Sequence, residues 1–161
     1  MLIKQPTEHQ EQVLFLSKLK YYYSRYPELM LIHATPNAAK RSVTGANYNK
    51  SEGLKPGVPD LNLPVARGEY GSLWIEMKKK KGGILSADQA FWINLLNASG
   101  NFAVVCKGAE EAEKILWAYM NEENGLEQYK VRYGIKKDKI GKKGGLSRMY
   151  VDLAFKFGWL V

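Results

Sequence analysis

The stretch from Asp60 to Lys78, DLNLPVARGEYGSLWIEMK, holds two runs in which apolar and polar residues alternate. Alternation with a period of two is typical of half-buried β-strands. The apolar residues of both runs have odd numbers: Leu61, Leu63, Val65, Leu73, Ile75 and Met77. Facing residues of an antiparallel pair project to the same side, so one shared core places Asp60, Glu76 and Lys78 together on the opposite face. A register that pairs Asp60 with Glu76 leaves a hairpin loop centred near Gly68.

On the N-terminal side of this hairpin, the sequence predicts one helix and one strand. Thr7 and Gln10 have the spacing of a capping box, and an apolar stripe follows, which predicts a helix from Glu8 to about Tyr26 that ends before Pro27. Residues 29–32 form a short apolar run that we interpret as a buried strand. Residues 34–59 are polar and rich in Gly, Asn and Pro, which suggests a functional loop region.

On the C-terminal side, Ser86 is expected to cap a helix over residues 87–98, with Gly100 just past its end. A strand over residues 101–107 and an amphipathic helix that begins after Gly108 should follow. The order helix, strand, hairpin, helix, strand, helix predicts an α/β fold, in which a mixed β-sheet is flanked by helices.

The composition of the chain limits the kinds of protein it can be. With 161 residues, 45% of them apolar, it has about the length of one domain with a sizeable core. Its one cysteine, Cys106, excludes a disulfide framework and fits a buried strand position in a cytoplasmic protein. Neither a membrane span nor a secretion signal is expected.

Positive charge is concentrated at the C-terminal end. The formal net charge is +8, and residues 126–161 hold nine Lys or Arg against three Asp or Glu. We therefore divide the chain into a core over residues 1–125 and a basic extension over residues 126–161, docked on the core or on a dimer partner. The excess charge favours a polyanionic partner, and the extension is interpreted either as a nucleic-acid contact or as a solvated loop with a closing element.

Two carboxylates and a lysine on one sheet face suit metal-assisted phosphate chemistry. Mg²⁺ prefers oxygen ligands, usually one or two carboxylates together with water and substrate phosphate oxygens. Asp60 and Glu76 supply carboxylates, and the carbonyl of Met77 is a further candidate ligand. Lys78 would orient a water molecule or stabilise charge on the phosphate. Gln89, in the first turn of the following helix, could reach the same site.

At these residues the sequence resembles the PD-(D/E)xK nuclease superfamily, and in particular its VRR-NUC branch, whose members are often small stand-alone phage or bacterial proteins. The resemblance covers residues 5 to about 120. It is carried by five segments in order: TEHQEQ at 7–12, HATPN at 33–37, GLKPGVPD at 53–60, LWIEMK at 73–78 and LSADQ at 85–89. It implies a restriction-endonuclease-like fold, Mg²⁺-dependent hydrolysis of phosphodiester bonds with Mn²⁺ as a substitute, and homodimers that act on branched DNA in the manner of Holliday-junction resolvases.

The resemblance also implies roles for individual residues. Asp60 and Glu76 would hold the metal, Lys78 would be the catalytic lysine, and Gln89 would support them. The acid that the family carries on its first helix would be Glu8. A helical wheel favours Glu8 over Glu11, because it puts Glu8 near the centre of the apolar stripe and Glu11 at its edge. An inward-facing acid needs a partner, which a metal centre would provide.

Contacts to DNA are expected from basic and polar residues near this site, namely Lys79, Lys80, Lys81, Asn37 and Arg41. Such contacts to the phosphate backbone would read DNA shape rather than sequence.

Other functions remain open at this stage. They are a nuclease acting on flaps, ends or duplex DNA, a non-catalytic nucleic-acid-binding module, and a basic RNA-associated protein. The acids at positions 60 and 76 disfavour a pure binding protein, because they would repel phosphate.

Overall fold

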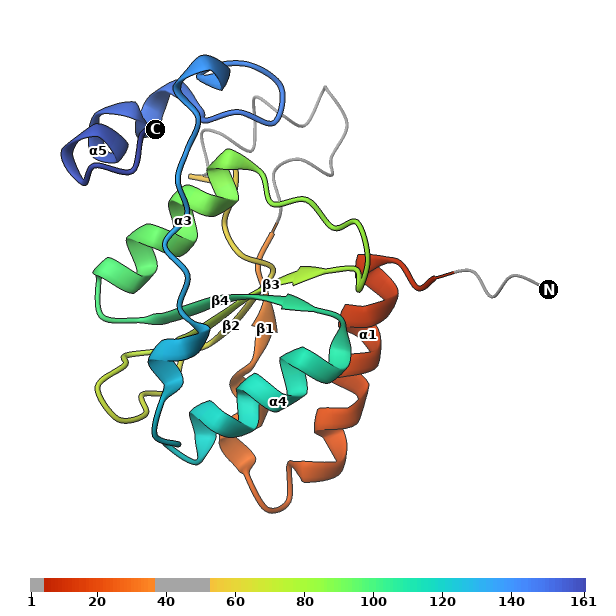
Figure 1. Ribbon diagram of the computed structural model, residues 1–161. Coiled ribbons are helices and arrows are strands. Elements are labelled where there is room, and N and C mark those ends of the chain that lie inside the picture. Colours follow the sequence, from red (N-terminus) through yellow and green to blue (C-terminus); the bar gives the residue numbers. More distant parts are fainter. Residues whose placement is uncertain (1–4, 37–52) are drawn as a thin grey trace.

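In the computed structural model, which describes residues 5–36 and 53–161, a four-stranded mixed sheet forms the centre of the molecule (Figure 1). The strands lie in the order β1-β2-β3-β4, with bounds His33–Ala34, Leu61–Leu63, Leu73–Lys78 and Phe102–Lys107. β2 pairs with β1 and with β3 in antiparallel fashion, whereas β3 and β4 run parallel. The expected α/β class, a mixed sheet flanked by helices, is confirmed.

Helices cover both faces of the sheet. α1 (Glu8–Leu19) and α4 (Ala109–Met120) lie on one face, and α3 (Ala87–Ala98) lies on the other (Figure 1). A short helix, α5 (Val151–Lys156), lies near the C-terminus. Turns of 3₁₀ helix occupy Lys20–Tyr22, Pro27–Leu31, Leu126–Tyr129, Lys137–Lys139 and Arg148–Tyr150. None of the helices in the described ranges is long and apolar enough to cross a membrane.

The β2–β3 hairpin has the register that the alternation predicts. Leu61 pairs with Ile75 and Leu63 with Leu73, so the continued register sets Asp60 opposite Glu76. The odd-numbered residues of both strands are fully or almost fully buried against α1 and α4. The thiol of Cys106 on β4 is buried in the same core, and this burial raises its pKa well above the usual value.

Two expectations for the N-terminal part are wrong. The first helix ends at Leu19 and not near Tyr26, because the chain turns there and packs the rings of Tyr22 and Tyr26 against Trp117 of α4. Residues 29–32 do not form a strand. Pro27 begins a 3₁₀ turn in which Leu29 alone is buried, and the strand follows at His33–Ala34.

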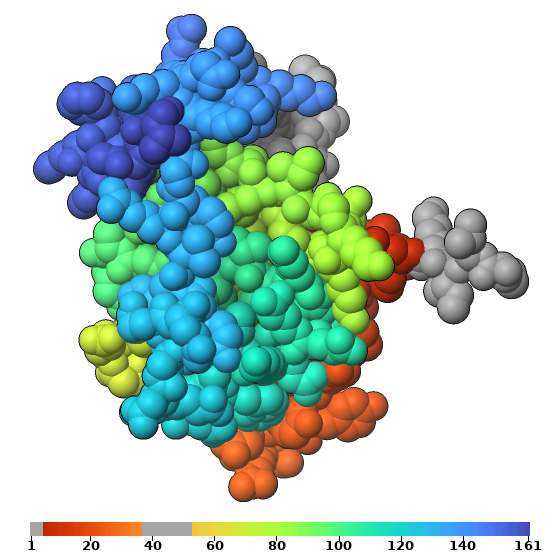
Figure 2. All heavy atoms as spheres, viewed as in Figure 1, coloured from red at the N-terminus to blue at the C-terminus, as the bar shows by residue number. Residues whose placement is uncertain are grey.

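The basic extension packs on α3. Phe91 of α3 stacks on Tyr150 with 4.4 Å between ring centroids and meets Trp159 edge-on. Leu146 and Ala154 complete this second apolar cluster, in which both are fully buried. The blue extension therefore lies directly over the green helix in the space-filling view (Figure 2).

Candidate active site

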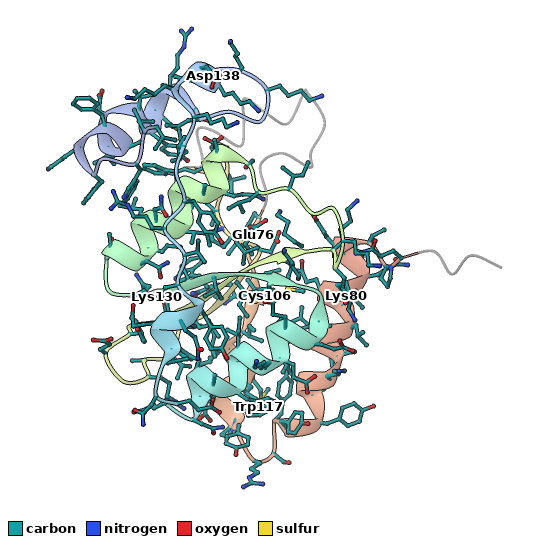
Figure 3. The ribbon with its side chains drawn as sticks, viewed as in Figure 1. Glu76, Lys80, Cys106, Trp117, Lys130 and Asp138 are labelled. Carbon is teal, nitrogen blue, oxygen red and sulfur yellow. The ribbon has the colours of Figure 1, made fainter. Side chains whose placement is uncertain are left out.

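Glu76 lies at the centre of the site, on β3, facing α3 (Figure 3). Its side chain is almost fully buried, with 1% of its surface exposed. One carboxylate oxygen, Oε1, accepts hydrogen bonds from Lys78 Nζ at 2.6 Å and from Gln89 Nε2 at 2.5 Å. The other oxygen, Oε2, is buried and finds no hydrogen-bond partner among the described residues. Since an unsatisfied buried carboxylate oxygen is costly, this atom indicates a functional group rather than a structural one.

Asp60 is the residue immediately before β2, and its side chain reaches across to β3. Its Oδ2 accepts a hydrogen bond from the Met77 amide at 2.9 Å, and its backbone carbonyl accepts from the Thr35 amide at 2.9 Å. The N–H and C=O groups of one strand residue point to the same neighbouring strand. The Met77 carbonyl therefore lies on the side of β3 that faces Asp60, which is the position expected of a backbone ligand.

Gln89 is the third residue of α3 and has two functions there. Its Oε1 accepts from the Ser86 amide at 2.9 Å, and the Ser86 hydroxyl accepts in turn from the Gln89 amide, which completes a capping box. Its Nε2 remains available to donate to Glu76. The local signal that starts the helix thus also orients a carboxylate of the site.

The two acids of the first helix lie in different environments. Glu8 is half-buried and lines the same cleft as Lys78 and Gln89. Glu11 is 2% exposed, and its Oε2 accepts from the Ala109 amide at 2.8 Å, at the start of α4. The helical wheel is therefore wrong about the stripe, whose centre is Glu11, Phe15 and Leu19. Gly108, the N-cap residue of α4, has no side chain that could cap the helix. The carboxylate of Glu11 accepts from the Ala109 amide instead.

The buried environment of Glu76 favours its protonated form. Burial raises the pKa of Glu76 to about 8, and the neighbouring carboxylate of Asp60 adds to this rise. The ammonium of Lys78 acts in the opposite direction, and the more distant Glu8 raises the pKa further. Three acids thus repel one another around one buried lysine, an arrangement that a bound cation would stabilise.

The donor set fits a hard divalent cation of the Mg²⁺ type. Within residues 5–36 and 53–161 no group of three or more His, Cys, Asp and Glu side chains is placed to hold a metal ion by itself. Two carboxylates and one backbone carbonyl suit Mg²⁺, which keeps several waters and takes oxygens from its phosphate substrate. The buried Oε2 of Glu76 is the observation that supports such a ligand.

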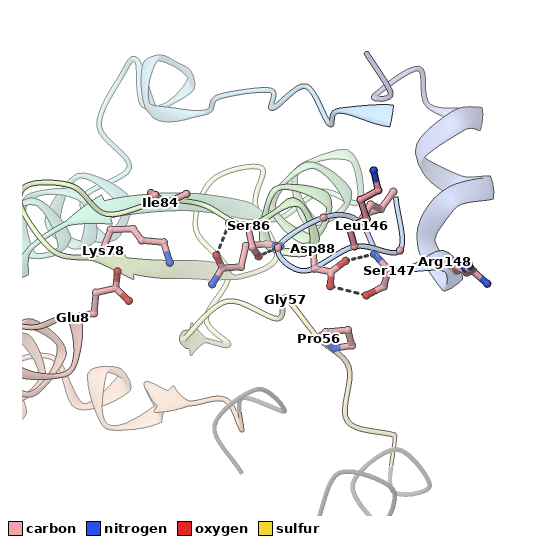
Figure 4. Close-up of a pocket in the computed structure, with 15 residues that line it drawn as sticks. Glu8, Pro56, Gly57, Lys78, Ile84, Ser86, Asp88, Leu146, Ser147 and Arg148 are labelled. Carbon is pink, nitrogen blue, oxygen red and sulfur yellow. Dashed lines mark hydrogen bonds between the residues drawn. The ribbon is translucent and has the colours of Figure 1, made fainter. Parts of the chain in front are cut away.

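A cleft of about 630 Å³ lies beside these residues. Glu8 and Lys78 lie on one side, Ser147 and Arg148 on the other, and Asp88 between them (Figure 4). The cleft wall made by residues 141–148 was not anticipated from the sequence. Its glycines and lysines indicated a basic loop, but no local pattern tells which part of the core such a loop contacts.

The lysines expected to bind DNA are placed away from this cleft. Lys79, Lys80 and Lys81 are exposed beyond the end of β3 and are not among the residues that line it. Lys80 forms an ion pair of 3.0 Å with Glu110, beside the start of α4 (Figure 3). This pairing lowers the pKa of Glu110. Asn37 and Arg41 lie outside the described residues.

Comparison with known proteins identifies the family of this chain. The family model of the VRR-NUC domain matches residues 6–110. A solved structure described as a VRR_NUC domain protein is similar to this chain, with a TM-score of 0.61 and 29% sequence identity, over 73% of this chain and 91% of the other. A search of curated proteins gave no match. The family match spans α1, the β2–β3 hairpin and α3, and the chain therefore belongs to the VRR-NUC family of nucleases.

Proposed function

We propose that this chain is a Mg²⁺-dependent endonuclease that hydrolyses phosphodiester bonds in branched DNA, such as Holliday junctions, and that it acts as a homodimer. The observation that carries the metal-dependent chemistry is the buried Glu76, with its unpartnered Oε2 beside Asp60 and Lys78. If Glu76 had a purely structural role, nothing would offset the free-energy cost of burying this oxygen without a hydrogen bond.

Asp60, Glu76 and the Met77 carbonyl would hold the cation, with Glu8 contributing from α1. Bound Mg²⁺ supplies a more acidic water molecule and neutralises phosphate charge, and Mn²⁺ is expected to substitute for it. Gln89 holds the Glu76 carboxylate in one orientation, as a group that supports a metal ligand does.

Lys78 acts on the reacting phosphate. Its side chain is only 6% exposed, and its ammonium is held by Glu76 at 2.6 Å. A lysine fixed in this way loses little conformational entropy when it orients the attacking water or stabilises charge in the transition state.

The preference for branched DNA and the dimer rest on the resemblance to junction resolvases. Resolution of a junction requires two cuts, and one site per chain then calls for a two-fold dimer. Large apolar side chains exposed on α1 and on the turns after it suit such an interface; they are Val13, Leu14, Tyr21, Met30 and Leu31.

Cleavage of end-labelled four-way junction, flap, single-stranded and duplex DNA tests the proposal. Wild-type protein with Mg²⁺ is compared with wild type in EDTA and with Asp60→Asn. We expect paired symmetric cuts in the junction, with Mg²⁺ only, and no cutting by the variant. Cutting of flaps or duplex instead would contradict the junction preference and retain the nuclease chemistry. Equal cutting in EDTA, or by Asp60→Asn, would overturn the metal site.

A further inference from the structure

The loop of residues 141–148 lies against the catalytic cleft although it belongs to the extension. The family match ends at residue 110, so this loop comes from a part of the chain outside the matched domain. It nevertheless supplies about half of the residues around the cleft: Gly141, Lys142, Gly144, Gly145, Leu146, Ser147 and Arg148. Any substrate that reaches Glu76 through this cleft passes the loop.

Hydrogen bonds fix the loop to the start of α3. The amide and the hydroxyl of Ser147 donate to the two carboxylate oxygens of Asp88, at 2.7 and 2.6 Å (Figure 4). Asp88 directly precedes Gln89, the residue that holds Glu76. The Ala87 amide also donates to the Gly144 carbonyl, at 3.3 Å. The loop is therefore joined to the same helical turn that orients the candidate metal ligand.

A second set of contacts holds the extension to the segment before Asp60. The hydroxyl of Tyr150 donates to the Pro56 carbonyl at 3.0 Å, and Trp92 Nε1 donates to the same carbonyl at 3.0 Å. Leu146, between Ser147 and the glycines, is fully buried. These contacts give the loop a fixed position relative to both halves of the site.

The charge of the loop compensates for the acids of the site. Glu8, Asp60 and Glu76 repel phosphate, and the ammonium of Lys78 is already paired with Glu76. The other cationic side chains around the cleft in the described chain are Lys142 and Arg148, and both are exposed. A polyanion can therefore approach the site most favourably along this wall.

Resting on the proposed function, we infer that this loop is a substrate-binding element of the active site, in which Lys142 and Arg148 contact backbone phosphates next to the scissile bond. The extension thus completes the DNA-binding surface of the nuclease domain.

Binding in the absence of cleavage tests this inference. A fluorescent four-way junction is titrated with Asp60→Asn protein in EDTA, and the dissociation constant is measured by anisotropy over a range of salt concentrations. The variants add Lys142→Gln with Arg148→Gln, or, as a control with the same charge change, Lys107→Gln with Lys114→Gln at the end of β4 and on α4, which do not line the cleft. All four positions are exposed, and thermal unfolding verifies that each protein is folded.

We expect the loop variant to bind at least about tenfold more weakly and the control to bind within about twofold of the parent. The slope of log Kd against log salt should fall by about 2 in the loop variant, since each lost phosphate contact removes about 0.9. Equal weakening by both pairs would overturn the inference, because net charge alone would then explain it, and so would unchanged binding in the loop variant. Because no cleavage is needed, the result stays separate from the proposed nuclease activity: weaker binding by the loop variant alone would support the inference even if the wild type failed to cut DNA.

Discussion

The side-chain amide of Gln89 joins the first turn of α3 to the carboxylate of Glu76 on β3. Its oxygen accepts from the Ser86 amide and its nitrogen donates to Glu76 Oε1, so one residue satisfies a helix end and fixes a candidate metal ligand. The other carboxylate oxygen of Glu76, Oε2, has no hydrogen-bond partner among the described residues. Helix initiation and site geometry are thus coupled through a single side chain.

Replacing Gln89 by Glu separates these two functions. Glutamate preserves the capping oxygens, but it cannot donate to Glu76 and adds a negative charge beside it. We expect the cleavage rate to fall about 10- to 100-fold, as for other groups that support a metal ligand, with a small change in melting temperature. Gln10→Glu is the matched control, because Gln10 holds the same capping position in α1. Equal loss of activity in both variants would show that Gln89 acts only on helix stability.

Glu8 and Glu11 should affect different properties. Glu8→Ala removes a carboxylate from the cleft and is expected to lower the cleavage rate with little effect on stability. Glu11→Ala leaves the buried Ala109 amide without its acceptor, which should cost about 1–3 kcal/mol in the free energy of unfolding. Urea unfolding and cleavage rates of the folded proteins measure the two effects. The reverse pattern would assign the metal site to Glu11.

Lys78→Met should lower the cleavage rate at least about 100-fold, because methionine fills the buried space of the lysine stem but carries no charge. Lys107→Met is the control, since Lys107 is the partner of Lys78 across the parallel β3–β4 pair and is exposed. Single-turnover cleavage at saturating enzyme measures the chemical step. Unchanged rates in the Lys78 variant would exclude it from catalysis.

The sequence predicts those parts of the fold that depend on local patterns. The alternation around Asp60 and Glu76 predicts the hairpin register, because a slip by one residue would turn the charged side chains toward the apolar core that packs against α1 and α4. The capping box at Thr7 and the N-cap at Ser86 are also confirmed. These signals depend on residues a few positions apart, and they bring Glu76, Lys78 and Gln89 into contact.

Features that depend on packing between distant segments could not be predicted in this way. Glu11 can lie on the inward side of α1 because its buried carboxylate accepts a hydrogen bond from the Ala109 amide, 98 residues away. In the same way, Asp88 and Ser147 meet because the extension packs on α3, and neither residue carries a sequence signal for that contact. The apolar run at residues 29–32 also led to a wrong prediction of a strand, because Pro27 begins a 3₁₀ turn that includes most of this run.

Gly57→Ala should disturb the site through the backbone. Gly57 has a φ of +86°, and a Cβ built on it would lie 2.4 Å from the carbonyl carbon of Asp88. The segment before Asp60 would have to move away from α3, so we expect lower stability together with a loss of cleavage. Gly53→Ala is the comparison, because Gly53 has a similar φ but open space around its Cβ position. If both variants behaved alike, backbone conformation rather than close packing on α3 would account for the effect.

The proposed dimer interface involves the exposed apolar surface of α1 and the turn that follows. Leu14 and Met30 are 47% and 65% exposed, and burial of such side chains would stabilise an association. We expect wild-type protein to have twice the 18.3 kDa mass of one chain in sedimentation equilibrium, and Leu14→Glu with Met30→Glu to reduce it to the single-chain mass. Phe155→Glu is the control, because Phe155 is a similarly exposed apolar residue on α5. A wild-type protein of single-chain mass at micromolar concentration would contradict the dimer, and dissociation caused by Phe155→Glu alone would move the interface to the extension. Since junction resolution requires two coordinated cuts, the dissociated variant should lose symmetric paired cleavage while each remaining chain keeps its metal-dependent site.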